Sequence, residues 1–183
     1  MSNPNVSTAP SMAGFAGRMA IVLGLIVVFT LVLLGPGGAA WMGRQLVTAQ
    51  LHAPDWRLIA EAPIAIKIHL ATVLAALLVA TLQMVGPKGT AVHRATGWTL
   101  SALFLVTAVA SLFIRNPQAG LLNPFQLFSV WTLIVVPWSV MAARAGNIRR
   151  HAALMTGFYF GGLILAGLLT FMPGRLMWRV FFG

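Results

Sequence analysis

The histidines are the residues of this sequence best suited to chemistry, because cysteine is absent and only two acidic residues occur. Without cysteine the chain can form no disulfide, no thiolate metal site and no c-type haem attachment. Of the four histidines, His69, His93 and His151 belong to apolar stretches, whereas His52 falls in a polar connector and is interpreted as a solvated residue. Imidazole nitrogens ligate haem iron and other metals, so metal chemistry here would depend on these three rings.

The depth of each histidine in a membrane decides which of them can cooperate. His69 is separated from the first tight turn by about 16 residues of helix, or about 24 Å. His93 and His151 each open a helix on the far side. Ligand atoms lie about 2 Å from a metal, so His69 and His93 cannot share one centre. His93 and His151 can serve as the two axial ligands of a haem b, with Arg94 and Arg150 beside the propionates.

Simpler interpretations of the same residues stay open. A histidine at a helix start near the lipid head groups is often only an interfacial polar residue, and His93 and His151 also fit that description. His69 and Gln83 share a stripe of small and polar residues, which indicates an interior face that hydrogen-bonds a neighbouring helix. Transport of protons or small solutes along this stripe is a third hypothesis, although the inverted repeats that usually build such sites are not evident.

Membrane-spanning helices are the elements that must position these side chains. The 183 residues are 59% hydrophobic and 8% charged, whereas a soluble domain carries about 25% charged residues. Mean hydropathy is +0.90. Apolar runs that approach the roughly 30 Å hydrocarbon core in length predict five helices, approximately at residues 18–35, 64–85, 91–114, 125–143 and 151–172. Short connectors predict an all-α, up-down bundle of antiparallel transmembrane helices.

The predicted organisation is a disordered N-terminal tail at residues 1–16 followed by one transmembrane domain at 17–183. The net charge of +10 comes from basic residues scattered between apolar runs, a pattern that favours lipid head groups over nucleic acid. Six basic residues fall on each predicted side, so the positive-inside rule is tied by count. Three arginines in the link at residues 144–150 favour a cytoplasmic N-terminus in a bacterial cytoplasmic (inner) membrane.

Several short motifs are similar to those of a family of bacterial integral membrane proteins defined only as a domain of unknown function. The residues that carry this resemblance are His69, the run from His93 to Trp98, Arg150 and His151, Met155, Tyr159, Gly161 and Gly162, and the Pro173-Gly174-Arg175 triplet. The resemblance covers roughly residues 60 to 183. It implies a multi-helix inner-membrane protein, and it supplies no activity, substrate or cofactor.

A looser likeness is architectural. Transmembrane di-haem cytochromes b of the quinol- or ascorbate-linked type hold haem between helix pairs near each membrane face, and the pairing of His93 with His151 is similar to one such pair. The predicted fourth helix lacks the histidine that a second pair would need. The likeness therefore implies one bis-histidine site at most.

Two functional hypotheses from different classes follow. The first is a b-type haem protein that exchanges electrons with a quinone or a membrane-protein partner. The second is a cofactor-free accessory or assembly subunit that docks partner helices. Neither paired carboxylates nor a nucleophile motif nor a phosphate-binding loop is evident, so we do not expect an enzyme that acts by itself.

Overall fold

The structure is a computed structural model that describes residues 40–114 and 124–182, together with positions 17, 20, 21, 24, 28, 37 and 38. The chain divides into two compact units, Met1–Ala49 and Gln50–Gly183. In the first unit residues 40–48 are helical. The predicted tail at 1–16 and most of the predicted helix at 18–35 lie outside the described residues, so the predicted count of five helices stays a prediction.

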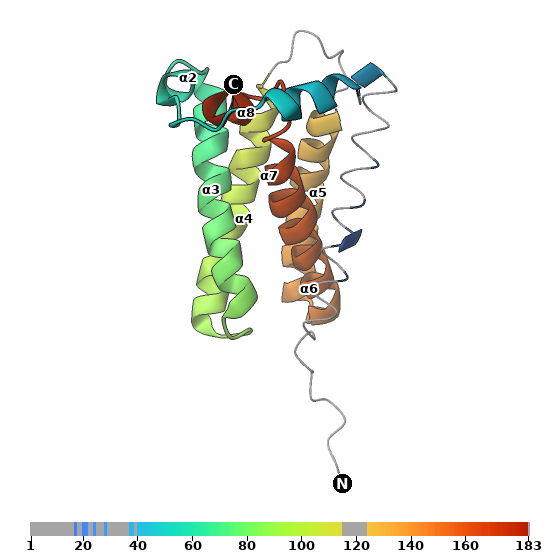
Figure 1. Cartoon of the computed structure of the whole chain (residues 1–183). Helices are drawn as coiled ribbons and strands as arrows, with labels where there is room; N and C mark the ends of the chain where they lie inside the picture. The colour runs from blue at the N-terminus through green and yellow to red at the C-terminus, as the bar shows by residue number, and fades with distance from the viewer. Residues whose placement is uncertain are drawn as a thin grey trace. The chain divides into compact units, whose positions relative to one another are not determined.

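The second unit is an all-helical bundle. Its described residues contain four helices long and apolar enough to cross a membrane, and Figure 1 shows that consecutive helices run antiparallel. These spans are α3 (Ile64–Val85), α4 (Ala91–Leu112), α5 (Pro124–Arg144) and a continuous helix made of α6 (Ile148–Gly157), η1 (Phe158–Leu165) and α7 (Ala166–Leu169). The predicted range 64–85 coincides with α3, and the predictions for α4 and α5 differ by two residues or fewer at either end.

The last span begins and ends three residues earlier than the predicted range 151–172. Asn147 caps its N-terminus because the Asn147 side chain accepts a hydrogen bond from the Arg150 backbone N–H at 3.1 Å. The preceding turn contains Gly146 at φ +76°, a conformation that favours glycine. The segment with the arginines was predicted to be a link, yet Arg149 and Arg150 belong to the first turn of α6. A polar N-cap was therefore a better boundary signal than the first apolar residue.

The π-helical segment η1 in the middle of the last span was not predicted. It contains Gly161 and Gly162, and a Cβ at Gly162 would lie 3.3 Å from the ring of Phe128 on α5. The glycine thus allows the two helices to approach closely at this level. π-Helical turns are rare and are frequently found at functional sites.

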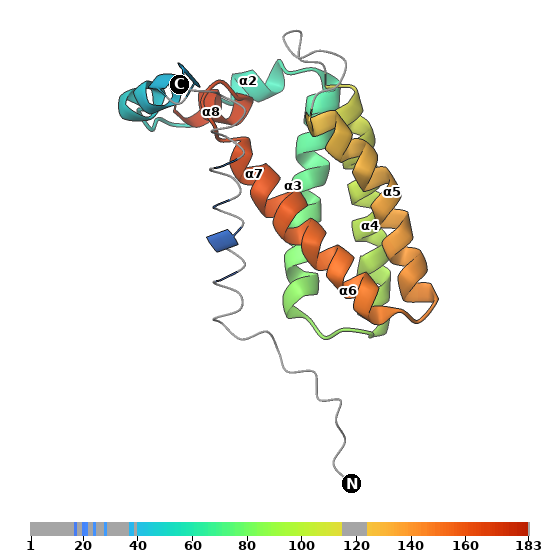
Figure 2. The same cartoon turned by 90° about the vertical axis from the view of Figure 1, so that its right-hand side faces the viewer.

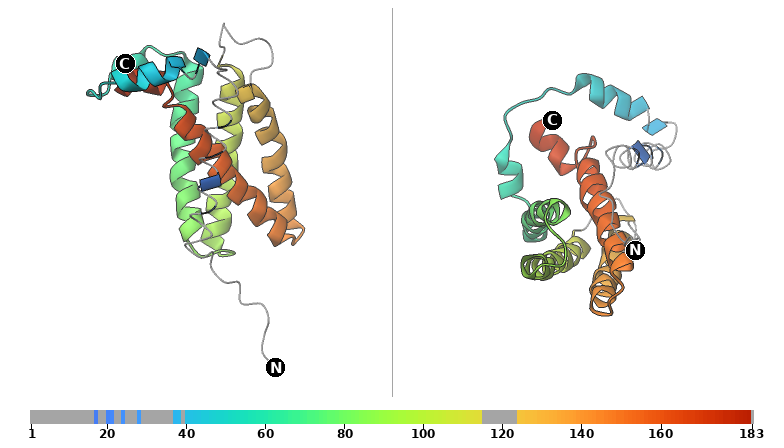
Figure 3. Two further views of the ribbon diagram at one scale, coloured as in Figure 1. Left: turned by 45° about the vertical axis from the view of Figure 1, so that its right-hand side comes forward. Right: turned by 90° about the horizontal axis from the view of Figure 1, so that it is seen from below.

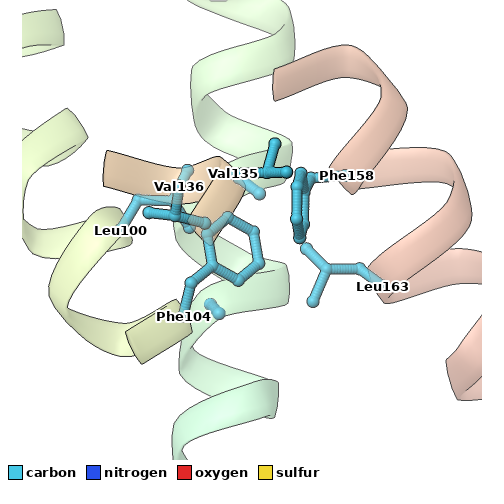
Figure 4. Close-up of a cluster of buried hydrophobic side chains, with 8 residues drawn as sticks. Leu100, Phe104, Val135, Val136, Phe158 and Leu163 are labelled. Carbon is cyan, nitrogen blue, oxygen red and sulfur yellow. The ribbon is translucent and has the colours of Figure 1, made fainter. Parts of the chain in front are cut away.

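The four spans are held in a defined order. Helix α4 packs between α3 and α5, α6 packs on α5, and η1 packs on α3. Figure 2 shows the last span running obliquely, from beside α5 at the end with the turns to beside α3 at the other end. Figure 4 shows the buried cluster that this crossing creates, with the ring of Phe104 between Val136 on one side and Phe158 on the other.

Two short helices lie at the end of the bundle opposite the α3–α4 turn. Helix α2 (Trp56–Ala60) and helix α8 (Leu176–Phe181) are joined through the segment before α2, because the backbone N–H groups of His52 and Asp55 donate to carbonyls of α8 at 3.0 Å. Trp178 of α8 is buried. Figure 3 shows α8 lying across the bundle axis rather than along it. Such a placement suits a helix at the membrane interface.

Candidate functional site

His151 lies in the first turn of α6 and is held by α5. Its ring Nδ1 lies 3.1 Å from both the carbonyl oxygen and the hydroxyl of Ser139, which is fully buried. A carbonyl can only accept, so a hydrogen bond to it requires the tautomer that carries the proton on Nδ1. In that tautomer of a neutral imidazole the lone pair is on Nε2. A histidine fixed through Nδ1 to a carbonyl, with Nε2 available, has the arrangement that metal-ligating histidines commonly show.

His93 lies in the first turn of α4 at the same end of the bundle. Its backbone N–H donates to the Thr90 hydroxyl at 3.0 Å, and its carbonyl accepts from Gln83 Nε2 at 3.1 Å. Its imidazole is partly buried and interacts electrostatically with that of His151. The structure therefore places His93 and His151 at the same end of the bundle, on two different helices.

Arg94 and Arg150 flank the two histidines and already have contacts of their own. The Arg94 guanidinium donates to the carbonyl of Gly89 at 2.8 Å. The Arg150 guanidinium lies over the ring of Trp138, 4.7 Å from its centroid. Both side chains are exposed, and each guanidinium has five N–H donors, so donors remain for an anion.

His69 lies near the opposite end of α3 and joins α3 to α4. Its Nδ1 donates to the carbonyl of Thr107 at 3.2 Å. The Thr107 hydroxyl in turn donates to the Thr72 hydroxyl at 2.7 Å, and Thr72 donates to the carbonyl of Ile68 at 2.8 Å. These groups satisfy one another across the helix interface, which is the role in helix packing that polar residues take in membranes.

Gln83 occupies the other end of the α3–α4 interface. Its Nε2 donates to the His93 carbonyl, whereas its Oε1 is buried and has no hydrogen-bond partner in the described part of the chain. Gly97 lies opposite, and a Cβ there would be 3.4 Å from Gln83 Nε2. The glycine thus makes room for the amide. His69 and Gln83 are both bonded to the backbone of α4, at opposite ends of the same interface.

Sequence reasoning missed the partners of these residues. Ser139 and Trp138 on α5 hold His151 and Arg150, yet neither residue type signals a site by itself. The tyrosine of the chain, Tyr159, was noted only as part of a resemblance. Its hydroxyl lies 3.3 Å from that of Thr81, which donates to the Leu77 carbonyl at 2.7 Å. Tyr159 therefore donates, and the pair connects η1 to α3.

A cavity of about 270 Å³ lies between α5 and the helix formed by α6 and η1. Its lining is apolar and rich in aromatic residues and glycine, namely Phe128, Trp131, Val135, Ala153, Leu154, Gly157, Phe158, Gly161 and Gly162. Neither His93 nor His151 lines it. A metal centre of three or more histidine, cysteine or acidic ligands is not present among the described residues. A metal bound by His93 and His151 would therefore have only these two imidazoles as protein ligands.

The apolar spans, with polar groups that bond helix to helix, define a multi-pass helical membrane protein. The chain belongs to the family described as "Predicted membrane protein (DUF2306)", which matches residues 66–181. This membership confirms the resemblance to a membrane domain of unknown function, and the matched range contains all the candidate residues above. No curated protein and no solved structure matches the chain.

Proposed function

We propose that this protein binds one haem b at the end of the bundle that carries His93 and His151. The observation that supports this most is the hydrogen bond from His151 Nδ1 to the buried carbonyl of Ser139, which leaves Nε2 as a free donor atom for iron. His93 supplies the second imidazole from α4. The two imidazoles would hold the haem iron through nitrogen atoms, outside the cavity between α5 and η1, which neither histidine lines.

Bound haem b supplies a one-electron carrier, so the proposed role is electron transfer to or from a quinone or a partner subunit in the same membrane. The residues of this chain orient the two ligands and supply positive charge. Arg94 and Arg150 are the cations beside the pair that can neutralise propionates, although Arg150 would have to leave Trp138 to do so.

The absorption spectrum of the detergent-solubilised full chain, expressed with haem supplementation, tests this proposal. We expect a Soret band in the wild type and its loss in His93→Ala and in His151→Ala. His52→Ala is the matched control, since His52 lies in a connector and its Nδ1 bonds the neighbouring carbonyl of Ala53. Absence of a Soret band from the supplemented wild type would refute haem binding.

A cofactor-free accessory or assembly subunit is the second candidate. It is favoured by the way the polar groups of the bundle satisfy one another, as in the bond of His69 to Thr107 and of His151 to Ser139, so that no ligand is needed to explain them. For such a subunit we expect the chain to co-purify with a larger complex. We also expect the His93→Ala, His151→Ala double variant to keep that association.

The proposed location is a bacterial cytoplasmic membrane with the α3–α4 turn and the N-terminus on the cytoplasmic side. By count of Lys and Arg the two sides are tied at six each. What favours this orientation is the crowding of Arg144, Arg149 and Arg150 around the short connection between α5 and α6, because positive charge accumulates on cytoplasmic loops.

A further inference from the structure

A cationic side chain, that of Arg150, lies beyond one end of the cavity between α5 and the last span. On α6, Ala153 and Leu154 lie three and four residues after Arg150, and Gly157 lies four and three residues after them, which places all four on one helix face. The last three line the cavity. Arg150 therefore stands at its end, one helical turn beyond the lining residues.

Helix α5 supplies the facing wall with the same periodicity. Phe128, Trp131, Val135 and Trp138 are spaced by three and four residues, so they form one stripe. The first three line the cavity, and the fourth carries the Arg150 guanidinium on its ring at 4.7 Å. The cation–π contact thus joins the two walls at the polar end of the groove.

The groove is open along its side and hollow at its floor. Trp131 exposes 54% of its surface, and Ala153 and Gly157 are exposed as well. A Cβ built at Gly157 or at Gly161 would meet no atom within 4 Å. From Arg150 to Gly161 the helix rises by about 16 Å, close to half of the roughly 30 Å hydrocarbon core. The groove therefore spans about one leaflet.

The charges at its mouth are not balanced within the described chain. Arg149 and Arg150 lie in the first turn of α6, which contains no acidic residue. The N-terminus of a helix is itself the positive end of the helix dipole, so two cations there raise an already positive potential. Lys88, Arg94 and Arg144 lie at the same end, where the described residues include no carboxylate side chain. An anion is the missing partner.

We propose that this groove binds an anionic phospholipid, with its phosphate at Arg150 and Arg149 and one acyl chain along Leu154, Gly157 and Gly161. Charge complementarity selects the head group, and the apolar groove one leaflet deep selects a chain over a free anion. Binding requires neither haem nor a second protein. Arg150 is also the proposed partner of a haem propionate, so the lipid measurement is made on the haem-free chain.

Native mass spectrometry of the purified full chain in detergent tests the proposal with three probes. Dioleoyl phosphatidylglycerol supplies both charge and chain, dioleoyl phosphatidylcholine supplies the chain without net charge, and inorganic phosphate supplies charge without a chain. We expect phosphatidylglycerol to bind more tightly than phosphatidylcholine, and we expect phosphate not to compete with it. Equal binding of the two lipids, or displacement by phosphate, would overturn the assignment.

Two variants locate the site. Arg150→Gln should weaken phosphatidylglycerol about fivefold, the equivalent of ~1 kcal/mol for one cation near the surface, and weaken phosphatidylcholine less, because its choline offsets the phosphate charge. The matched control is Arg179→Gln on α8, at the other end of the bundle. Gly157→Leu should fill the groove and weaken both lipids, whereas Gly167→Leu should not, since a Cβ at Gly167 also meets no atom within 4 Å yet Gly167 does not line the cavity.

Far-UV circular dichroism establishes that each variant keeps its helical content. Leucine favours helix more than glycine does, so neither glycine variant should unfold. If Gly157→Leu and Gly167→Leu bind lipid alike, the acyl chain does not occupy the groove. If Gly157→Leu instead dissociates a dimer of the wild-type chain, a second copy occupies it. Either result would overturn the proposal and leave the haem test unaffected.

Discussion

Replacing Phe158 by alanine should remove the side chain that joins three helices of the bundle. Phe158 is 6% exposed, and its ring centroid lies 5.6 Å from that of Phe104 on α4 and 6.1 Å from that of Phe128 on α5. Aromatic pairs contribute about 0.5–1.5 kcal/mol each, so the loss of two pairs amounts to about 1–3 kcal/mol. A cavity of roughly 100 Å³ at about 24 cal/mol per Å³ gives a similar ~2.4 kcal/mol.

In a soluble protein, such a substitution also loses the free energy gained when the side chain is transferred from water to the protein interior. In a membrane protein this contribution is smaller. An unfolded membrane segment stays in apolar surroundings, so packing is the main term that changes. We therefore expect Phe158→Ala to lower the free energy of unfolding by about 2 kcal/mol. The value can be measured by titration with sodium dodecyl sulfate in mixed micelles, followed by far-UV circular dichroism.

Phe113→Ala is the matched control, because Phe113 is 70% exposed and the same atoms are removed without opening a cavity. Its free energy of unfolding should stay within about 0.5 kcal/mol of the wild type. If Phe158→Ala and Phe113→Ala lose the same free energy, the buried cluster does not hold α4, α5 and η1 together, and the packing argument fails.

Three further substitutions probe local contacts with the same unfolding assay. Thr107→Val removes the hydroxyl that bonds α3 and should lower the free energy of unfolding by about 0.6 kcal/mol, at most ~1.7. The control Thr99→Val should lower it less, because the Thr99 hydroxyl bonds only its own helix. Equal losses would refute an interhelical contribution. Gly89→Ala forces a Cβ onto φ +75° and should cost about 1 kcal/mol; an unchanged stability would show that the turn relaxes. Asn147→Ala removes the cap on the Arg150 N–H and should cost about 1 kcal/mol, with faster amide exchange in the first turn of α6; unchanged exchange would count against the cap.

Much of the fold could be predicted because few backbone conformations are stable in lipid. Long apolar runs must be helices, since their backbone groups find no partners in hydrocarbon, and short links make neighbours antiparallel. The same reasoning placed His93 and His151 at one end and His69 towards the other. The start of α6 was placed too late, because an arginine pair was taken to be a link although Asn147 caps a helix that contains it.

The sequence by itself thus determined the class of protein, the position of α3 and the end of the bundle at which each histidine lies. The stripe of His69 and Gln83 also indicated which face of α3 meets a neighbouring helix. The rotation of the other helices was not determined, because buried and lipid-facing residues are equally apolar. Phe158 is buried and Phe171 is 43% exposed, yet no local pattern separates them. Only the packing of four helices decided that Ser139 holds His151, that Trp138 lies under Arg150 and that η1 leaves a groove, since each of these contacts joins segments whose mutual rotation is set by side-chain fit.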